Sequence, residues 1–452
     1  MSRNFLGRAS LSLAIGLSLT ACAAREPAAQ PAFGPTTGGW SLADGRIVAV
    51  APASGGSLRW RTIDGRTARL VGTGVSLQAT MGWSAQADPT PLTFDGPRGL
   101  VSFDRQAASR LTFDITETRF ESAGATLAGR LVLPPGDAPV PLLVEVHGSE
   151  RTSALSYNPM QQLGPASGVG VFVYDKRGTG GSTGAYTQNF ALLARDAAAA
   201  VTEARRLAGA RTGRVGLHGG SQGGWVAPLA AGFAPVDFVI VGFGLTESPL
   251  AENRAETIQD IAEAGFDAEA QRKAGELADA AGTVMASRYR SGYPDLDRLK
   301  RLYRDEPWYA HARGEFTGDF LRYPSWVLRL AGPSRDVGTT WRHESEPPLR
   351  ALRVPMLWLL AGADRSAPPE ATRALLTRLI GDGLPITLAE FPDTDHGIIA
   401  FTPGPGGERV QTGYAPGYFP MILDFALARP LQSGAYGTAV LTTASTRAHP
   451  AE

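Results

Sequence analysis

The chain has 452 residues, with 43 basic and 43 acidic side chains, 43% hydrophobic residues and one cysteine. A single cysteine excludes a disulfide scaffold, and a net charge of zero offers no basic surface for nucleic acid, whose phosphates require clustered Lys and Arg. The histidines are scattered, with no pair at the spacing of metal ligands, so the sequence predicts neither a metal nor another cofactor.

Residues 1–22 have the features of an export signal. Arg3 and Arg8 precede an apolar stretch, Ala9 to Leu19, that is too short to span the ~30 Å hydrocarbon core of a bilayer as a helix. The chain's cysteine, Cys22, follows the small-residue end of this stretch. We therefore expect the segment to be removed during export.

The end of this signal resembles the lipobox of bacterial lipoproteins. The resemblance implies that Cys22 is acylated and becomes the mature N-terminus, anchoring the protein in the cell envelope. Because Ala23 follows the cysteine, it further implies the outer membrane, with the protein facing the periplasm. An ordinary cleaved signal peptide is the alternative. Residues 23–39, rich in Ala and Pro, are predicted to be a linker.

Residues 40–110 are predicted to form a small all-β domain, because short β-prone runs alternate with turn signals such as Asp64-Gly65. This region contains no histidine and no cysteine, so we assign it packing or partner binding rather than chemistry. The expected strands include Arg46 to Ala51, Ser57 to Ile63 and Thr67 to Val71.

From Leu111 the pattern changes to strands that alternate with helix-prone segments, which predicts an α/β fold with a mainly parallel sheet and helices on both faces. Leu111 to Phe120 and Thr126 to Leu133 are expected to form a hairpin. The expected buried strands are Leu142 to Val146, Val169 to Tyr174, Arg214 to His218, Val236 to Val241, Val354 to Leu360 and Ile386 to Phe391. The predicted core comprises residues 111–246 and 351–431, and residues 432–452 are expected to be a loosely ordered tail.

Residues 247–350 interrupt this alternation with charged, helix-prone sequence rich in aromatic residues. We interpret this segment as a helical insertion. Ligands of open α/β sheets bind at the carboxyl ends of the strands, so an insertion leaving from there would form a cap over the site.

The most informative motif is Gly219-x-Ser221-x-Gly223, between a strand and a helix-prone run. A sharp strand-to-helix turn holds a serine hydroxyl exposed beside amide donors, at the expense of a strained backbone, and the glycines remove side chains that would collide. Ser221 is therefore the predicted nucleophile.

A serine nucleophile requires a base and a carboxylate that orients the base. His396 is the predicted base, because it follows the last expected strand and lies at the same edge of the sheet as Ser221. Asp364, which follows the strand Val354 to Leu360, is the favoured carboxylate, with Asp393 and Asp395 as alternatives.

The order Ser221, Asp364, His396 resembles that of α/β-hydrolases of the serine esterase and peptidase type. Further matching motifs are His147-Gly148-Ser149 and Asp175-Lys176-Arg177-Gly178-Thr179-Gly180-Gly181-Ser182. The resemblance covers about Leu111 to Leu431 and implies an oxyanion hole formed by the backbone amides of Gln222 and Ser149. Glu145 departs from the apolar strand around it, and we expect a structural role, paired with an arginine, with a contact to the site as the alternative.

The sequence thus predicts a serine hydrolase that cleaves carboxylic esters through an acyl-enzyme. The aromatic insertion suggests an apolar substrate, although those side chains are better explained as the insertion's own core. A serine peptidase or amidase of the same fold is the alternative. A second alternative is an inactive, surface-tethered binding protein.

Overall fold

The computed structural model describes residues 34–73, 76–96 and 98–443. The expected export signal, Cys22 and most of the expected linker lie outside these residues. Within the described residues, no helix combines the length and apolar character needed to cross a membrane.

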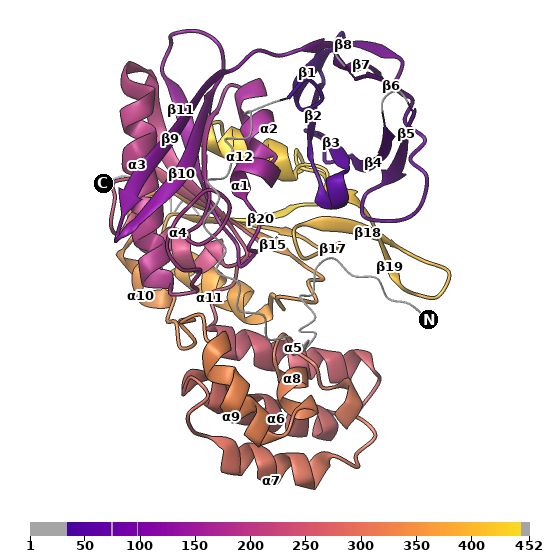
Figure 1. Ribbon diagram of the computed structural model, residues 1–452, viewed down its shortest axis with the longest axis vertical. Coiled ribbons are helices and arrows are strands. Elements are labelled where there is room, and N and C mark those ends of the chain that lie inside the picture. The colour runs from indigo at the N-terminus through magenta and orange to yellow at the C-terminus, as the bar shows by residue number, and fades with distance from the viewer. Residues whose placement is uncertain (1–33, 74–75, 97, 444–452) are drawn as a thin grey trace, which may run out of the picture.

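The N-terminal region folds as an antiparallel sheet of eight strands in the order β5-β4-β3-β2-β1-β8-β7-β6 (Figure 1). Its core is built on Trp40, Trp60 and Phe103, which are almost fully buried. The expected small all-β domain is therefore confirmed. Its strands are β1 (Gly38–Leu42), β2 (Ile47–Pro52), β3 (Leu58–Thr62), β4 (Thr67–Thr73), β5 (Ser76–Met81), β6 (Leu92–Asp95), β7 (Gly99–Phe103) and β8 (Gln106–Arg110).

The central sheet has nine strands in the order β20-β16-β15-β14-β13-β11-β12-β10-β9. The six strands from β16 to β12 in this order run parallel, which confirms the mainly parallel sheet, and the expected hairpin is the antiparallel pair β9 and β10. The strands are β9 (Asp114–Ser122), β10 (Ala125–Leu133), β11 (Val140–Val146), β12 (Gly170–Tyr174), β13 (Thr212–Gly220), β14 (Phe238–Gly242), β15 (Met356–Ala361), β16 (Ile386–Phe391) and β20 (Val440–Thr442).

Helices cover both faces of this sheet. One face packs against side chains such as Leu193, Trp225 and Leu376, and the other against side chains such as Leu163 and Ile422. The first set lies on α3 (Phe190–Ala208), α4 (Gly223–Ala231) and α11 (Glu370–Gly381), and the second on α2 (Met160–Ala166) and α12 (Tyr418–Ala426), with the short α1 (Ala154–Tyr157) preceding α2.

The expectation of a loose tail from residue 432 is wrong for residues 432–443. Strand β20 pairs antiparallel with β16 and extends the sheet. The Tyr436 hydroxyl donates a hydrogen bond to Asp424 at 2.9 Å, and its ring is buried. Burial of this ring and a full set of strand pairs outweigh the polar composition of the segment.

A small third sheet follows β16 and consists of β17 (Thr394–Asp395), β18 (Ile399–Pro403) and β19 (Arg409–Tyr414). It contacts the N-terminal domain, because the Trp83 amide donates to the carbonyl of Gln411 at 3.1 Å and Arg66 forms a β-bridge with Gly413. The pair of strands β18 and β19 therefore joins the N-terminal domain to the domain of the central sheet. It lies next to the segment that carries His396 (Figure 1).

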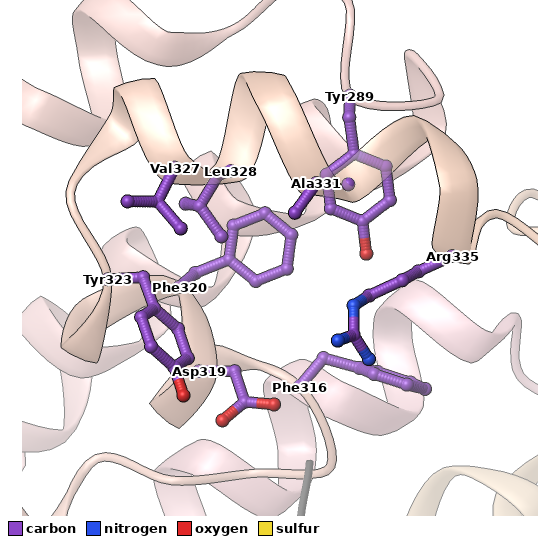
Figure 2. Close-up of a pocket in the computed structure, with 10 residues that line it drawn as sticks. Tyr289, Phe316, Asp319, Phe320, Tyr323, Val327, Leu328, Ala331 and Arg335 are labelled. Carbon is purple, nitrogen blue, oxygen red and sulfur yellow. The ribbon is translucent and has the colours of Figure 1, made fainter. Parts of the chain in front are cut away.

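The segment between β14 and β15 is helical. Its helices are α5 (Pro249–Glu263), α6 (Ala268–Ala286), α7 (Tyr293–Tyr303), α8 (Thr317–Arg322), α9 (Ser325–Ala331) and α10 (Glu346–Ala351). Most of its aromatic side chains pack into its own hydrophobic core, around Tyr293, Tyr303 and Trp308. This insertion also contains a cavity of about 80 Å³. Its lining side chains, among them Tyr289, Phe320 and Tyr323, are drawn in Figure 2. The aromatics therefore serve the insertion's own stability.

A buried ion pair fastens the loop after β12 to α3. The Arg177 guanidinium donates to both carboxylate oxygens of Asp196 at 2.6 Å, and both side chains are buried. We expect Asp196→Asn to lower the free energy of unfolding by about 3 to 5 kcal/mol, because it leaves a buried guanidinium without its counter-charge. Urea unfolding measures this loss. The exposed pair of Glu269 and Arg272 supplies the control, since Glu269→Gln should change stability little. Equal effects of the two substitutions would contradict the prediction.

Candidate active site

Ser221 lies on the turn between β13 and α4. Its φ angle is 52°, in the left-handed region that a non-glycine residue rarely adopts, so the expected backbone strain is present. A Cβ atom at Gly219 would lie 2.6 Å from the carbonyl oxygen of Gly223. Only glycine fits there, and the tight turn it permits leaves the Ser221 hydroxyl at the carboxyl end of the sheet.

His396 approaches Ser221 from the other side of this edge. It follows β17, and its Nε2 lies 3.2 Å from the Ser221 Oγ. The Phe243 ring stands edge-on to the imidazole, with centroids 5.0 Å apart. The imidazole therefore packs against the residue that directly follows β14.

Asp364 follows β15 and faces the remaining imidazole nitrogen. Its Oδ2 lies 2.8 Å from His396 Nδ1, and its Oδ1 accepts hydrogen bonds from the amides of Ser366 and Ala367, both at 2.9 Å. The alternative Asp395 instead accepts from the His396 amide at 3.0 Å and pairs with Arg409. Asp393 is exposed to solvent. The structure therefore brings together Ser221, His396 and Asp364, an arrangement that can move a proton from the hydroxyl to the imidazole.

The charge state of His396 depends on its surroundings. Burial lowers the pKa of His396, but the charge and hydrogen bond of Asp364, together with the charges of Glu252 and Asp395, outweigh it and raise the pKa to about 9. The imidazole is therefore protonated in the free protein at neutral pH. A reaction that uses it as a base should gain rate as the pH rises toward this pKa.

Glu252, on α5, offers a way to test this dependence. Burial, and then the charge of Glu315, raise the pKa of Glu252 to about 8, so the carboxylate is ionised in the pH range where His396 titrates. Glu252→Gln removes a negative charge that stabilises the imidazolium. We expect the acid limb of the kcat/KM profile to move to lower pH. Glu269→Gln, at the exposed partner of Arg272 on α6, is the control. An unmoved limb in Glu252→Gln would refute the prediction.

Hydrogen bonds fix the loop after β11. His147 Nε2 lies 2.5 Å from the Tyr174 carbonyl oxygen, the Lys176 ammonium donates to the Gly148 carbonyl at 2.7 Å, and the Tyr186 hydroxyl donates to the Ser149 carbonyl at 2.6 Å. Within the described part of the chain, no hydrogen bond is donated by the amide of Ser149 or of Gln222. Both predicted oxyanion donors are thus available to a ligand.

The prediction that Glu145 pairs with an arginine is wrong. Its carboxylate faces His218, whose Nδ1 lies 3.0 and 3.1 Å from the two oxygens, and it accepts a hydrogen bond from Asn158 at 3.1 Å. The two residues are opposite each other on the paired strands β11 and β13. Only the strand order, which the sequence did not supply, makes them neighbours.

The comparisons with known proteins identify the family of this chain. The model of the Alpha/beta hydrolase family matches residues 142–405, which is more than half of the chain. The chain belongs to the alpha/beta hydrolase family. This confirms the expected fold and places the Ser221, Asp364 and His396 segments within one family domain. No curated protein sequence matches this hydrolase.

Solved structures similar to this α/β hydrolase include esterases and peptidases. An esterase from Pyrococcus furiosus is 13% identical, with a TM-score of 0.41, and the match covers 63% of this chain and 83% of that one. An acylaminoacyl peptidase from Pyrococcus horikoshii is 14% identical, with a TM-score of 0.44, covering 86% of this chain and 57% of that one. A proline iminopeptidase from Mycobacterium smegmatis is 18% identical, with a TM-score of 0.39, covering 62% and 91%.

Helix α5 of this α/β hydrolase is joined at both of its ends to the segments that carry Ser221 and Asp364. The Trp225 indole donates to the Glu247 carbonyl at 2.7 Å, just before α5, and Glu263 at its end pairs with Arg365 at 2.7 Å. Trp225 follows Ser221 in the chain and Arg365 follows Asp364, so α5 connects the segments that carry these two residues. Its acidic residues were not predicted as site residues, because a charged helix is usually a solvated face.

Among the residues that the structure describes, no three His, Cys, Asp or Glu side chains of this hydrolase form a group that could hold a metal ion. The chemistry available at the site is therefore argued from Ser221, His396 and Asp364.

Proposed function

We propose that this protein is a serine hydrolase that cleaves carboxylic esters. The observation that carries the proposal is the continuous contact from the Ser221 hydroxyl to His396 at 3.2 Å and from His396 to Asp364 at 2.8 Å. His396 takes the proton of Ser221 as its oxygen attacks the carbonyl carbon of the ester. The tetrahedral intermediate collapses, and His396 gives that proton to the leaving alcohol, so that the acyl group stays on Ser221.

Water then releases the acyl group. His396 removes a proton from the water, whose oxygen attacks the acyl carbon, and the proton returns to Ser221 as the acid leaves. The amides of Ser149 and Gln222 are the proposed donors to the oxyanion in both steps, each contributing about 3 kcal/mol of barrier lowering. Helix α5 and the rest of the insertion are the proposed cap.

An amide substrate is the second candidate, because the same three side chains can cleave amides. The aromatic residues of the insertion pack into its own core, which removes the one reason for preferring an apolar ester. A panel of p-nitrophenyl esters compared with aminoacyl anilides decides between the candidates. Higher kcat/KM on the anilides would make the protein an amidase.

Reaction with a fluorophosphonate probe tests the proposal directly. We expect the probe to modify the wild-type protein at Ser221, identified by mass spectrometry of the labelled peptide. A folded protein that takes no label would overturn the proposal and favour the inactive, surface-tethered binding protein.

We also propose that Cys22 carries the lipid anchor and that the protein faces the periplasm from the outer membrane. Cys22→Ser is expected to move the protein from the membrane fraction to the soluble fraction of a bacterial expression host, and to abolish incorporation of labelled palmitate. Ser10→Ala, within the apolar stretch, is the matched control. An unchanged membrane fraction in Cys22→Ser would contradict the anchor.

A further inference from the structure

The loop after β11 lies against the turn that carries Ser221. A Cβ atom at Gly148 would lie 3.5 Å from the carbonyl oxygen of Gly220, the residue before Ser221. Gly148 and Ser221 also line the same cleft, which has a volume of about 320 Å³. The peptide unit between Gly148 and Ser149, whose N–H is one of the two proposed oxyanion donors, is therefore adjacent to the proposed nucleophile.

The ammonium of Lys176 holds this peptide unit by its oxygen. Its Nζ donates to the Gly148 carbonyl at 2.7 Å. The peptide unit is planar and trans, so its C=O and N–H point in opposite directions within one rigid plane. A donor that fixes the Gly148 oxygen therefore also fixes the direction of the Ser149 N–H.

The hydrogen bond from Lys176 also makes the Ser149 amide a stronger donor. A hydrogen bond from a charged group is about twice as strong as one between neutral groups, and consecutive hydrogen bonds polarise one another. An ammonium that draws electron density toward the Gly148 oxygen leaves the Ser149 N–H more positive. The gain is larger for the oxyanion of the tetrahedral intermediate than for the neutral carbonyl of the substrate, so it lowers the barrier rather than only tightening binding.

The ammonium of Lys176 is buried without a counter-charge. Only 1% of the residue is exposed, and no carboxylate of the described residues forms an ion pair with it. Its other close neighbour is the Tyr186 ring, whose centroid lies 4.7 Å from Nζ. Burying a charge in this way costs free energy that an apolar side chain of similar volume would avoid. The charge therefore points to a role at the Gly148 carbonyl.

Titratable groups surround Lys176. Burial lowers the pKa of Lys176 to about 8, although the charge of Glu150 opposes this effect, and the charge of Arg151 adds to it. The Tyr186 ring faces the ammonium, and His147 Nε2 accepts a hydrogen bond from the Lys176 amide at 3.2 Å. The side chain is therefore mostly protonated at pH 7 and loses its charge as the pH rises through about 8.

We propose that Lys176 is a positioning residue for the oxyanion hole, whose ammonium aligns and polarises the peptide unit between Gly148 and Ser149. This inference rests on the proposed function for the reacting atoms. It adds a residue that acts through the backbone and does not touch the substrate.

Lys176→Met tests the role, because it keeps most of the side-chain volume and removes the charge. We expect kcat on the most active ester of the panel to fall about 10- to 100-fold, with KM changed less than about threefold. An alkyl trifluoromethyl ketone is the second probe. The Ser221 oxygen bonds to its carbonyl carbon, the electron pair of the C=O bond moves to oxygen as the oxyanion, and His396 keeps the proton. The inhibition constant of the ketone should rise by about the factor by which kcat/KM falls.

Lys300→Met is the matched control. The Lys300 ammonium also holds backbone carbonyls, those of Phe320 and Tyr323 at 2.7 and 2.6 Å. It belongs to α7, at the end of the insertion that is far from the central sheet (Figure 1). Lys300→Met should lower the melting temperature and leave both kcat and the inhibition constant of the ketone unchanged.

The pH dependence separates the charge of Lys176 from its packing. The ratio of the wild-type kcat/KM to that of Lys176→Met should be largest below pH 8 and should shrink as the pH rises, because the wild type then loses the charge that the variant lacks at every pH. Glu150→Gln, at a half-exposed side chain, removes a charge that raises the pKa of Lys176. Its kcat/KM relative to the wild type should therefore fall as the pH rises from 6 to 9.

Three results would overturn the role of Lys176: unchanged kcat in folded Lys176→Met, a rise in KM without a loss of kcat, or a ratio of wild type to variant that does not change with pH. If Lys176→Met does not fold, a ratio of Glu150→Gln to wild type that is independent of pH overturns it instead. A wild-type protein that takes no fluorophosphonate label would refute the proposed function itself. A labelled wild type with a fully active Lys176→Met would refute only the role of Lys176.

Discussion

Ser221→Ala is expected to lower kcat by about 10⁴- to 10⁶-fold on any ester that the wild-type protein turns over, because it removes the hydroxyl that His396 contacts. The oxyanion donors and the binding cleft remain in place, so residual hydrolysis above the rate in water should persist. The substitution should also abolish fluorophosphonate labelling. Both measurements use the same purified protein and the most active ester of the panel.

Two controls separate loss of the nucleophile from loss of the fold. Ser334→Ala, at an exposed serine that caps a turn of the insertion, should label and turn over substrate as the wild type does. The melting temperature of Ser221→Ala should match that of the wild type, whereas Ser221→Gly should melt higher, because glycine tolerates a φ of 52°. Full activity in Ser221→Ala would remove Ser221 from the mechanism.

The sequence located Ser221, His396 and Asp364 because each carries a local signal. Ser221 has glycines on both sides, and Asp364 and His396 each follow an apolar run that predicts a buried strand. Parallel strands place their carboxyl ends on one edge, so three local signals become one site. The choice of Asp364 over Asp395 also followed from geometry, since a neighbour of His396 accepts from its amide rather than reaching Nδ1.

The features that the sequence missed all depend on contacts between distant segments. Glu145 and His218 become partners only because β11 and β13 are adjacent. The strand β20 is short, and its sequence shows no alternation of apolar and polar residues that would predict a strand. It is a strand because it pairs with β16. Glu252 and Glu256 lie on a charged helix, and the raised pKa of each arises from burial that no residue pattern of α5 reports.

Asp364→Asn is expected to lower kcat by about 10⁴-fold, because an amide cannot hold the imidazole with its proton on Nδ1 and its Nε2 free to accept from Ser221. The change should also move the acid limb of the remaining activity to lower pH. Burial lowers the pKa of His396, and Asp364 is the main group that raises it. Removing the Asp364 carboxylate therefore lowers the pKa of His396, because less remains to offset the effect of burial. The kcat/KM profile from pH 5 to 10 measures both effects.

Asp395→Asn is the matched control, since Asp395 is adjacent to His396 and contributes to its raised pKa without contacting Nδ1. It should shift the acid limb in the same direction and reduce kcat only slightly. The comparison separates two roles of a carboxylate near the base. Asp364 supplies charge and also selects the tautomer, whereas Asp395 supplies charge without contacting the ring. If the two substitutions gave equal losses of kcat, orientation of the imidazole would not be the role of Asp364, and the hydrogen bond of 2.8 Å would be structural.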